Sequence, residues 1–236
     1  MIDLARTADP DLAELLGKHP RIGKVENGDV DGIEFWQGSW QRSVFVGDPG
    51  MEVSGLIELM DNNPLVCTDA ASVPDPISTL ALIALGPISL AGLVTEAPTV
   101  IANIDFDPDL TGKFLSGAGW PSGIIGHVER RDLGTVLAIT AMAAIATPDH
   151  WDEIDDIYAE HYSRSFFVRE AAEAPWEPES VAAKPWAIYR LRYTPDEPTS
   201  LLTIQVLADT DGKAGRAQLL HAMNVMAGFE ESLGIA

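Results

Sequence analysis

A histidine and a glutamate two residues apart, His127 and Glu129, are the side chains of this sequence best suited to proton transfer. Side chains at this spacing on a β-strand point to the same side, so both groups would reach one pocket. Imidazole and carboxylate commonly exchange protons with a bound substrate near neutral pH. The two residues are therefore predicted to form an acid–base pair. The alternative is a histidine satisfied by hydrogen bonds in the core beside a solvent-facing glutamate.

Three arginines, Arg130, Arg131 and Arg169, stand out because the chain is strongly acidic. Its 236 residues include 36 acidic and 15 basic ones, which gives a formal net charge of −21. Guanidinium groups bind carboxylates through two parallel hydrogen bonds. The arginines are therefore predicted to bind a substrate carboxylate. Ion pairing with the many surface acids is the alternative for each of them.

The sequence favours a small molecule over other kinds of ligand. The negative charge would repel phosphate polymers, so nucleic acid is not expected to bind. Cys67 is the only cysteine, which excludes disulfide frameworks and multi-cysteine metal sites. Asp105, Asp107 and Asp109 lack the glycine and the distal glutamate of a calcium loop, so a solvated acidic loop is predicted there. No metal ion is expected.

Neither the start of the chain nor its most apolar segment predicts a membrane protein. Residues 1–6 lack the apolar core and flanking positive charge of a secretory signal, so a cytoplasmic location is expected. Residues 77–94 are uncharged, but Gly86 and Pro87 interrupt them. This run is predicted to form a buried helix, a break at the proline and a second short element.

Several other segments have a clear period. Residues 187–193 alternate between apolar or aromatic residues and arginines, which predicts a strand with one wet or ligand-facing side. Residues 200–208 are predicted to pair with it in antiparallel fashion, and a strand is favoured at 135–139. Helices are predicted at 151–162, with Asp149 as N-cap, and around 219–226. Residues 105–126 have little periodicity and are expected to form a long loop over a binding site.

Three segments carry a family resemblance. Residues 213–218 and 223–231 resemble the Lys-Gly-Ala-Ala-Gly-Gln helix and the Asn-Met-Asn-Leu-Met-Phe-Gly ending of the N-acetyl-γ-glutamyl-phosphate reductases, members of the semialdehyde-dehydrogenase superfamily. Residues 158–169 are similar to the Tyr-rich helix and Phe-Val-Arg turn of this family. Residues 127–134 resemble its Pro-His-Leu-Val-Pro-Met-Asp-Arg-Gly stretch.

The resemblance implies an α+β or α/β fold in shortened form. It implies a reduced Rossmann-like segment over residues 1–72 and a semialdehyde-dehydrogenase-like catalytic and dimerisation domain over residues 73–236. Residues 65–67 would be a strand of the nucleotide domain, and Lys213 would contact an anion. The chain would form a homodimer through residues 134–229.

The chain departs from the family where the family does its chemistry. Pro76 stands at the position of the nucleophilic cysteine, and a thiohemiacetal cannot form on proline. Asp3, Arg6 and Asp9 occupy the glycine-rich loop, where carboxylates would oppose a bound pyrophosphate. The chain has no counterpart of the family's histidine-rich loop between residues 120 and 126. NADP-dependent reduction by the route of this family is therefore not expected, and no cofactor is expected.

Two function classes remain. The first is a non-redox enzyme of specialised metabolism that uses acid–base chemistry on a small amino or keto acid, of the amine–carbonyl condensation or cyclisation type. The second is a catalytically inactive, reductase-like binding or partner protein. Fold alone cannot choose between them, because one scaffold can host many functions.

Overall fold

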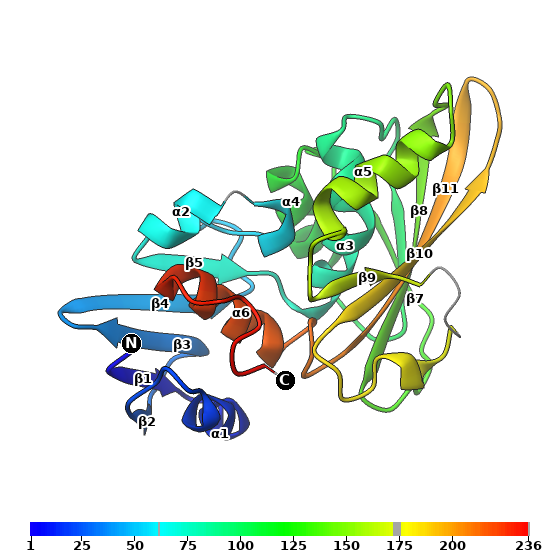
Figure 1. The fold of residues 1–236 in the computed structure, drawn as a ribbon. Coiled ribbons are helices and arrows are strands. Elements are labelled where there is room, and N and C mark those ends of the chain that lie inside the picture. Colours follow the sequence, from blue (N-terminus) through cyan, green and yellow to red (C-terminus); the bar gives the residue numbers. More distant parts are fainter. Residues whose placement is uncertain (61, 172–175, 236) are drawn as a thin grey trace. The chain divides into compact units, whose positions relative to one another are not determined.

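The computed structural model describes residues 1–60, 62–171 and 176–235, which form two units. The first unit consists of residues 1–75 and 215–236, and the second of residues 76–214. The sequence-based division at residue 72 placed the C-terminal helix with the second domain. The structure packs this helix in the first unit (Figure 1), because its apolar side chains join the core of the N-terminal sheet.

The first unit is built on a five-stranded mixed sheet. Its strand order is β2-β1-β3-β4-β5, with β1–β2 and β4–β5 parallel and the other two pairs antiparallel. The elements are β1 (Leu4–Thr7), α1 (Pro10–Lys18), β2 (Val25–Asn27), β3 (Gly32–Gln37), β4 (Trp40–Val46), η1 (Ile57–Leu59), α2 (Asn62–Cys67), β5 (Ala70–Val73) and α6 (Arg216–Ala227). The predicted strand at 65–67 is wrong, since these residues end helix α2. Pro64 lies in the first turn of α2, where a missing N–H breaks no helical bond.

Buried Arg42 on β4 holds two helix ends against this sheet. Its guanidinium donates to the carbonyls of Leu65 and Val66 at the end of α2, each at 2.9 Å, and to the carbonyl of Met226 at the end of α6. A positive charge is favourable at the C-terminal end of a helix, where carbonyls lack partners. The docking of α6 thus depends on a polar contact as well as on apolar burial.

The second unit is built on a six-stranded sheet of order β7-β6-β8-β11-β10-β9, with helices on one face (Figure 1). The expected strands at 187–193 and 200–208 are confirmed within β10 and β11, which pair in antiparallel fashion, and the strand expected at 135–139 is confirmed from Val136 onward as the start of β8. The elements are α3 (Pro76–Leu90), β6 (Thr99–Ala102), α4 (Pro108–Gly117), β7 (Ile125–Val128), β8 (Val136–Ala146), α5 (Asp152–Tyr162), β9 (Val168–Glu170), η2 (Pro178–Ser180), β10 (Ala187–Thr194) and β11 (Thr199–Asp209).

Helix α3 continues through Pro87, so the predicted break at this proline is wrong. Proline lacks an N–H, and the carbonyl of Ile83 one turn earlier therefore loses its helical donor. The hydroxyl of Tyr162 donates to that carbonyl at 3.1 Å, and the hydroxyl of Tyr158 donates to the carbonyl of Ala84. Burial raises the pKa of Tyr158 well above its ordinary value, which keeps its hydroxyl protonated. Helix α5 thus supplies, through Tyr162, the donor that the proline removes.

Two further expectations need correction. Residues 105–126 are not one long loop, because helix α4 begins after Asp107, whose carboxylate accepts hydrogen bonds from the backbone N–H of Asp109 (2.9 Å) and of Leu110 (3.3 Å). Helix α5 begins after Trp151, and its N-cap makes no side-chain hydrogen bond, so Asp149 does not cap it. In the part of the chain that the structure describes, we find no helix with the length and apolar character needed to cross a membrane.

Candidate functional site

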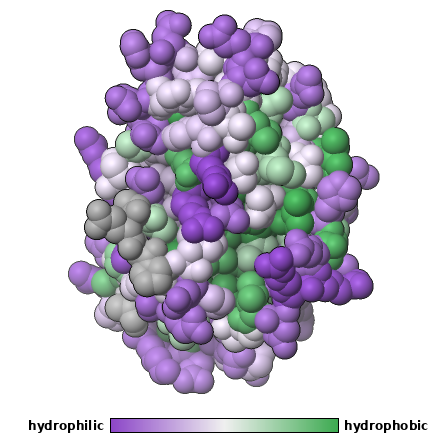
Figure 2. Space-filling view, turned by 90° about the vertical axis from the view of Figure 1, so that its right-hand side faces the viewer, coloured by the Kyte–Doolittle hydropathy of each residue, from purple (hydrophilic) through white to green (hydrophobic). Residues whose placement is uncertain are grey.

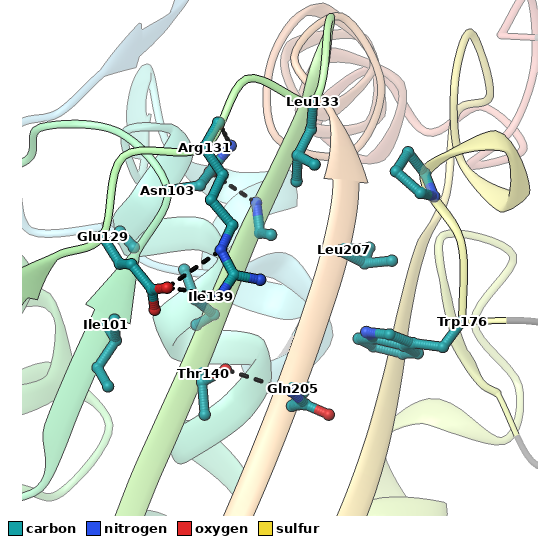
Figure 3. Close-up of a pocket in the computed structure, with 13 residues that line it drawn as sticks. Ile101, Asn103, Glu129, Arg131, Leu133, Ile139, Thr140, Trp176, Gln205 and Leu207 are labelled. Atoms are coloured by element: carbon teal, nitrogen blue, oxygen red, sulfur yellow. Dashed lines mark hydrogen bonds and ion pairs between the residues drawn. The ribbon is translucent and has the colours of Figure 1, made fainter.

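A pocket of about 230 Å³ lies on the face of the six-stranded sheet opposite α3 (Figure 3). Figure 2 shows this side of the molecule, where hydrophobic residues gather among hydrophilic ones. Strands β6, β8 and β11 form the floor, and the segments before β8 and around η2 form the walls. The lining residues are Ile101, Ala102, Asn103, Glu129, Arg131, Leu133, Ala138, Ile139, Thr140, Trp176, Pro178, Gln205 and Leu207.

Strand alternation explains why this face is available. Along β8, Leu137 and Ile139 are buried, whereas the side chains of Ala138 and Thr140 between them are only partly buried. Successive side chains of a strand point to opposite faces, so one set packs under the helices and the other faces the pocket. The register places Gln205 directly opposite Thr140 on the neighbouring strand β11.

Glu129 and Arg131 form an ion pair at the edge of the pocket (Figure 3). The Arg131 Nε and Nη2 atoms donate to the same oxygen, Oε1 of Glu129, at 3.1 and 2.5 Å. Among the described residues no hydrogen bond uses Oε2 of Glu129 or Nη1 of Arg131. Both side chains are well exposed, so the pair adds little to stability, but it keeps a carboxylate oxygen and a guanidinium nitrogen available to a ligand.

Asn103 holds the backbone that carries this ion pair. Its amide nitrogen donates to the carbonyls of Arg131 (3.3 Å) and Val136 (3.2 Å), and its amide oxygen accepts from the backbone N–H of Ala138 (2.8 Å). The Asn103 side chain is 7% exposed. With both its oxygen and its nitrogen engaged, it acts as a structural clamp rather than as a ligand-binding group.

A row of polar side chains crosses the sheet beside the pocket. Arg190 Nε on β10 donates to Oε1 of Gln205 at 2.7 Å, and Nε2 of Gln205 lies 3.4 Å from Oγ1 of Thr140. The guanidinium of Arg190 lies 4.3 Å from the ring centre of Trp176. Trp176, Arg190, Gln205 and Thr140 were not among the predicted site residues. The alternation at 187–193, which indicated a wet or ligand-facing side, was the signal that pointed toward Arg190.

The structure places His127 on the same face, outside the pocket lining. His127 lies opposite Ile101 on β6, and Ile101 lies opposite Thr140 on β8. The imidazole is exposed, and the carboxylate of Glu129 is bound by Arg131. An acid–base role for His127 and Glu129 remains a prediction.

The other predicted binding residues lie elsewhere. Arg130 pairs with Asp105 at 2.8 and 2.6 Å, and this hydrogen-bonded contact raises the pKa of Arg130. Arg169 lies 3.8 Å from the ring centre of Trp186 and donates to a backbone carbonyl. Lys213 is fully buried, with Nζ 5.2 Å from the ring centre of Phe167. Of the predicted site residues, only Glu129 and Arg131 line the pocket.

The start of α1, where a Rossmann fold binds pyrophosphate, carries a carboxylate of the chain itself. Asp9 caps α1 by accepting from the backbone N–H of Asp11 (2.9 Å) and Leu12 (3.3 Å). Arg216 binds the same carboxylate at 2.7 Å. Burial alone would raise the pKa of Asp9, but the hydrogen bonds from Arg216 and from these backbone groups outweigh it and lower the pKa.

The two other residues at the glycine-loop positions are also engaged. Arg6 pairs with Glu26 at 2.7 Å, and Asp3 accepts from the backbone N–H of Gly38 at 2.7 Å. Pro76 is the first residue of α3. Asp3, Arg6 and Asp9 therefore have structural roles at the start of the first unit. Within the described ranges, no three His, Cys, Asp or Glu side chains cluster closely enough to hold a metal ion.

Comparisons with known proteins agree with this architecture at the level of fold. No family model and no curated protein sequence matches the chain. Two crystal structures of aspartate semialdehyde dehydrogenase II from Vibrio cholerae are similar to it. The structure complexed with ASA has a TM-score of 0.64 at 10% identity and covers 97% of this chain and 98% of that chain. The other has a TM-score of 0.66 at 10% identity and covers 97% and 99%. The chain therefore has the semialdehyde dehydrogenase fold.

Proposed function

We propose that the chain is a non-redox enzyme that carries out acid–base chemistry on a small amino or keto acid, of the amine–carbonyl condensation or cyclisation type. The observation that supports this most is the ion pair of Glu129 and Arg131 at the edge of a pocket whose floor carries Thr140 and Gln205. A carboxylate base beside a carboxylate-binding guanidinium is what such a reaction needs. We place this activity in specialised metabolism.

The pocket suits a compound of this size and charge. At about 230 Å³ it is smaller than the sites that hold drug-sized ligands, and it combines apolar walls with a few polar groups. Arg131 would bind the substrate carboxylate, and Glu129 would take a proton from the neighbouring carbon. His127, on the same face, would exchange that proton with solvent.

The residues at the inherited reaction centre support a reaction without hydride transfer. Pro76 offers no nucleophile, and the N-terminus of α1 is capped by Asp9. A bound pyrophosphate would have to displace this carboxylate from the backbone N–H groups and from Arg216.

Proton exchange tests the proposal without knowledge of the final product. The protein is incubated in D2O with a panel of amino acids and 2-oxo acids, and loss of the Cα–H signal of the amino acids and of the C3–H signal of the 2-oxo acids is followed by NMR. Glu129→Gln should slow the exchange about a hundredfold to ten-thousandfold, as is typical when a general base is lost. The control is Glu160→Gln, because Glu160 is exposed on α5 at the helix-covered face. Full activity of Glu129→Gln would contradict the assignment.

A catalytically inactive binding or partner protein is the second candidate. It is favoured by the direct contact between Glu129 and Arg131, which already occupies one oxygen of the proposed base. Saturable ligand binding without α-proton exchange for any compound of the panel would support this candidate over the enzyme.

We also propose a homodimer that forms through the sheet of the second unit. The sheet face that carries the pocket also carries partly exposed apolar residues such as Met142 and the more exposed Leu201. Covering such a face with its own copy would give an isologous interface. A small-molecule carboxylate and a second copy of the chain are thus the expected partners, in the cytoplasm.

A further inference from the structure

We propose that the pocket binds its ligand as a free α-amino acid in one fixed orientation, and that Arg190, outside the pocket lining, sets this orientation. The inference rests on the proposed function only in taking the pocket as the ligand site. It adds the ligand class and a positioning residue on the neighbouring strand β10.

Arg190 determines which way the amide of Gln205 points. A glutamine side chain can present either its oxygen or its nitrogen to a given neighbour. Guanidinium has donors only, so the atom of Gln205 that lies 2.7 Å from Nε of Arg190 must be the oxygen. The amide nitrogen therefore faces β8, where it lies 3.4 Å from the hydroxyl oxygen of Thr140.

Trp176 keeps Arg190 in place. Its indole ring lies 4.3 Å from the guanidinium carbon, a distance at which the ring face attracts the cation. Arg192, two residues further along the same strand, lies opposite Thr203 rather than Gln205. The contact with the amide of Gln205 is therefore specific to Arg190.

The fixed amide makes the floor of the pocket a donor surface. Because Thr140 accepts from Gln205, its hydroxyl hydrogen can point to a ligand, and the amide nitrogen of Gln205 has a second hydrogen. Figure 3 shows this pair on adjacent strands, with the Glu129–Arg131 pair on one side and Trp176 on the other. The floor and the guanidinium of Arg131 thus favour a ligand carboxylate.

Beside the floor, the carboxylate of Glu129 favours a positively charged group of the ligand rather than a carboxylate. Oε2 of Glu129 is an acceptor, and it favours an ammonium group. An α-amino acid carries a carboxylate and an ammonium on the same α-carbon, which matches this pair of adjacent surfaces. A 2-oxo acid would place a carbonyl oxygen against the carboxylate of Glu129, and this repulsion disfavours it.

The apolar walls indicate the kind of side chain. Leu133, Leu207, Pro178 and the ring of Trp176 line the rest of the pocket. Leu207 is 4% exposed, whereas Leu133, Pro178 and Trp176 are partly exposed. The limited volume favours a short aliphatic side chain over a long or charged one.

Calorimetric titration tests this assignment with defined probes. L-alanine and L-valine are compared with pyruvate and 2-oxo-3-methylbutanoate on the wild type, Arg190→Ala, Arg190→Lys and the matched control Arg192→Ala. We expect the wild type to bind L-valine at least about tenfold more tightly than 2-oxo-3-methylbutanoate, because one charged contact typically contributes this much to affinity. Arg190→Ala should lower L-valine affinity about tenfold and reduce the selectivity, Arg190→Lys should restore part of both, and Arg192→Ala should change neither.

Three outcomes would overturn the inference. The first is the absence of saturable binding of either amino acid at millimolar concentration. The second is equal affinity for the amino and 2-oxo acids in the wild type. The third is identical behaviour of Arg190→Ala and Arg192→Ala. Turnover is judged separately by α-proton exchange, so Arg190-dependent binding without exchange would refute the enzyme proposal and leave this inference standing.

Discussion

The start of helix α1 and the open face of the six-stranded sheet use their charged side chains in opposite ways. At the start of α1, the carboxylate of Asp9 caps the helix and binds Arg216. On the sheet face, the carboxylate of Glu129 is bound through one oxygen only, by an exposed arginine. The first carboxylate completes the structure, and the second keeps a free acceptor at a pocket.

This difference shows how a fold can keep its architecture and offer ligands a different surface. A helix N-terminus attracts anions because its N–H groups lack partners. Once a side chain of the same protein fills that position, the attraction supports folding instead of binding. On the face of the six-stranded sheet, the backbone groups are paired within the sheet, so the polar side chains are not needed to complete them and can serve a ligand.

The largest expected effect concerns nicotinamide cofactors. We expect isothermal titration of the wild type with NADP and NADPH to show no saturable binding, because Asp9 occupies the N-terminus of α1. A micromolar site would correspond to about 8 kcal/mol of binding free energy. Affinity in that range would show that the start of α1 can still bind a nucleotide, and would contradict the purely structural role given to Asp9.

A second prediction concerns the apolar part of the sheet face. Light scattering at micromolar concentration should show a dimer, and Met142→Lys should convert it to a monomer, because a lone charge at the centre of an apolar interface is strongly unfavourable. Val66→Lys is the control, since Val66 is 41% exposed on α2 of the other unit. A monomeric wild type would rule out this use of the face.

A third prediction sharpens the role of Asp9. Asp9→Ala should lower the free energy of unfolding by about 1–2 kcal/mol, the usual effect of losing an N-cap. The folded state lowers the pKa of Asp9, so its contribution is present at neutral pH and is lost as the pH falls below the ordinary value of 3.8. The difference in the free energy of unfolding between wild type and variant, measured by urea denaturation, should therefore be smaller at pH 3 than at pH 7. A constant difference would contradict this.

The smallest expected effect is on the sheet face. Arg131→Ala should change the free energy of unfolding by less than about 1 kcal/mol, because its ion pair with Glu129 is exposed. The same variant should clearly weaken binding of an amino acid if the proposed ligand site is right. A stability loss as large as that of Asp9→Ala would remove the contrast between the two regions.

The parts of the fold that follow from local sequence could be predicted, and those that depend on distant partners could not. Alternation identified β10, and a high content of β-branched and aliphatic residues identified β11. The break at Pro87 was predicted wrongly, because the hydroxyl of Tyr162 that compensates for it lies far away in sequence. The start of α4 was missed although Asp107 followed by a proline is a local capping signal.

The candidate site shows the same division. Glu129 and Arg131 could be chosen from residue type and spacing, and the structure places them at one pocket. Trp176 and Gln205 could not be chosen, because they reach the pocket from segments far from Glu129 in the chain. Arg190 was visible only as one of several alternating arginines, since its contact with Gln205 depends on the strand register.

The proline in α3 has a consequence for the order in which mutations can accumulate. Replacing Tyr162 by phenylalanine removes the hydroxyl that donates to the carbonyl of Ile83, and this loss is costly while Pro87 denies that carbonyl a backbone donor. If Pro87 is replaced first by alanine, the helical N–H returns and the hydroxyl becomes dispensable. The two positions are thus epistatic, and a lineage that loses the proline before the tyrosine follows the easier path.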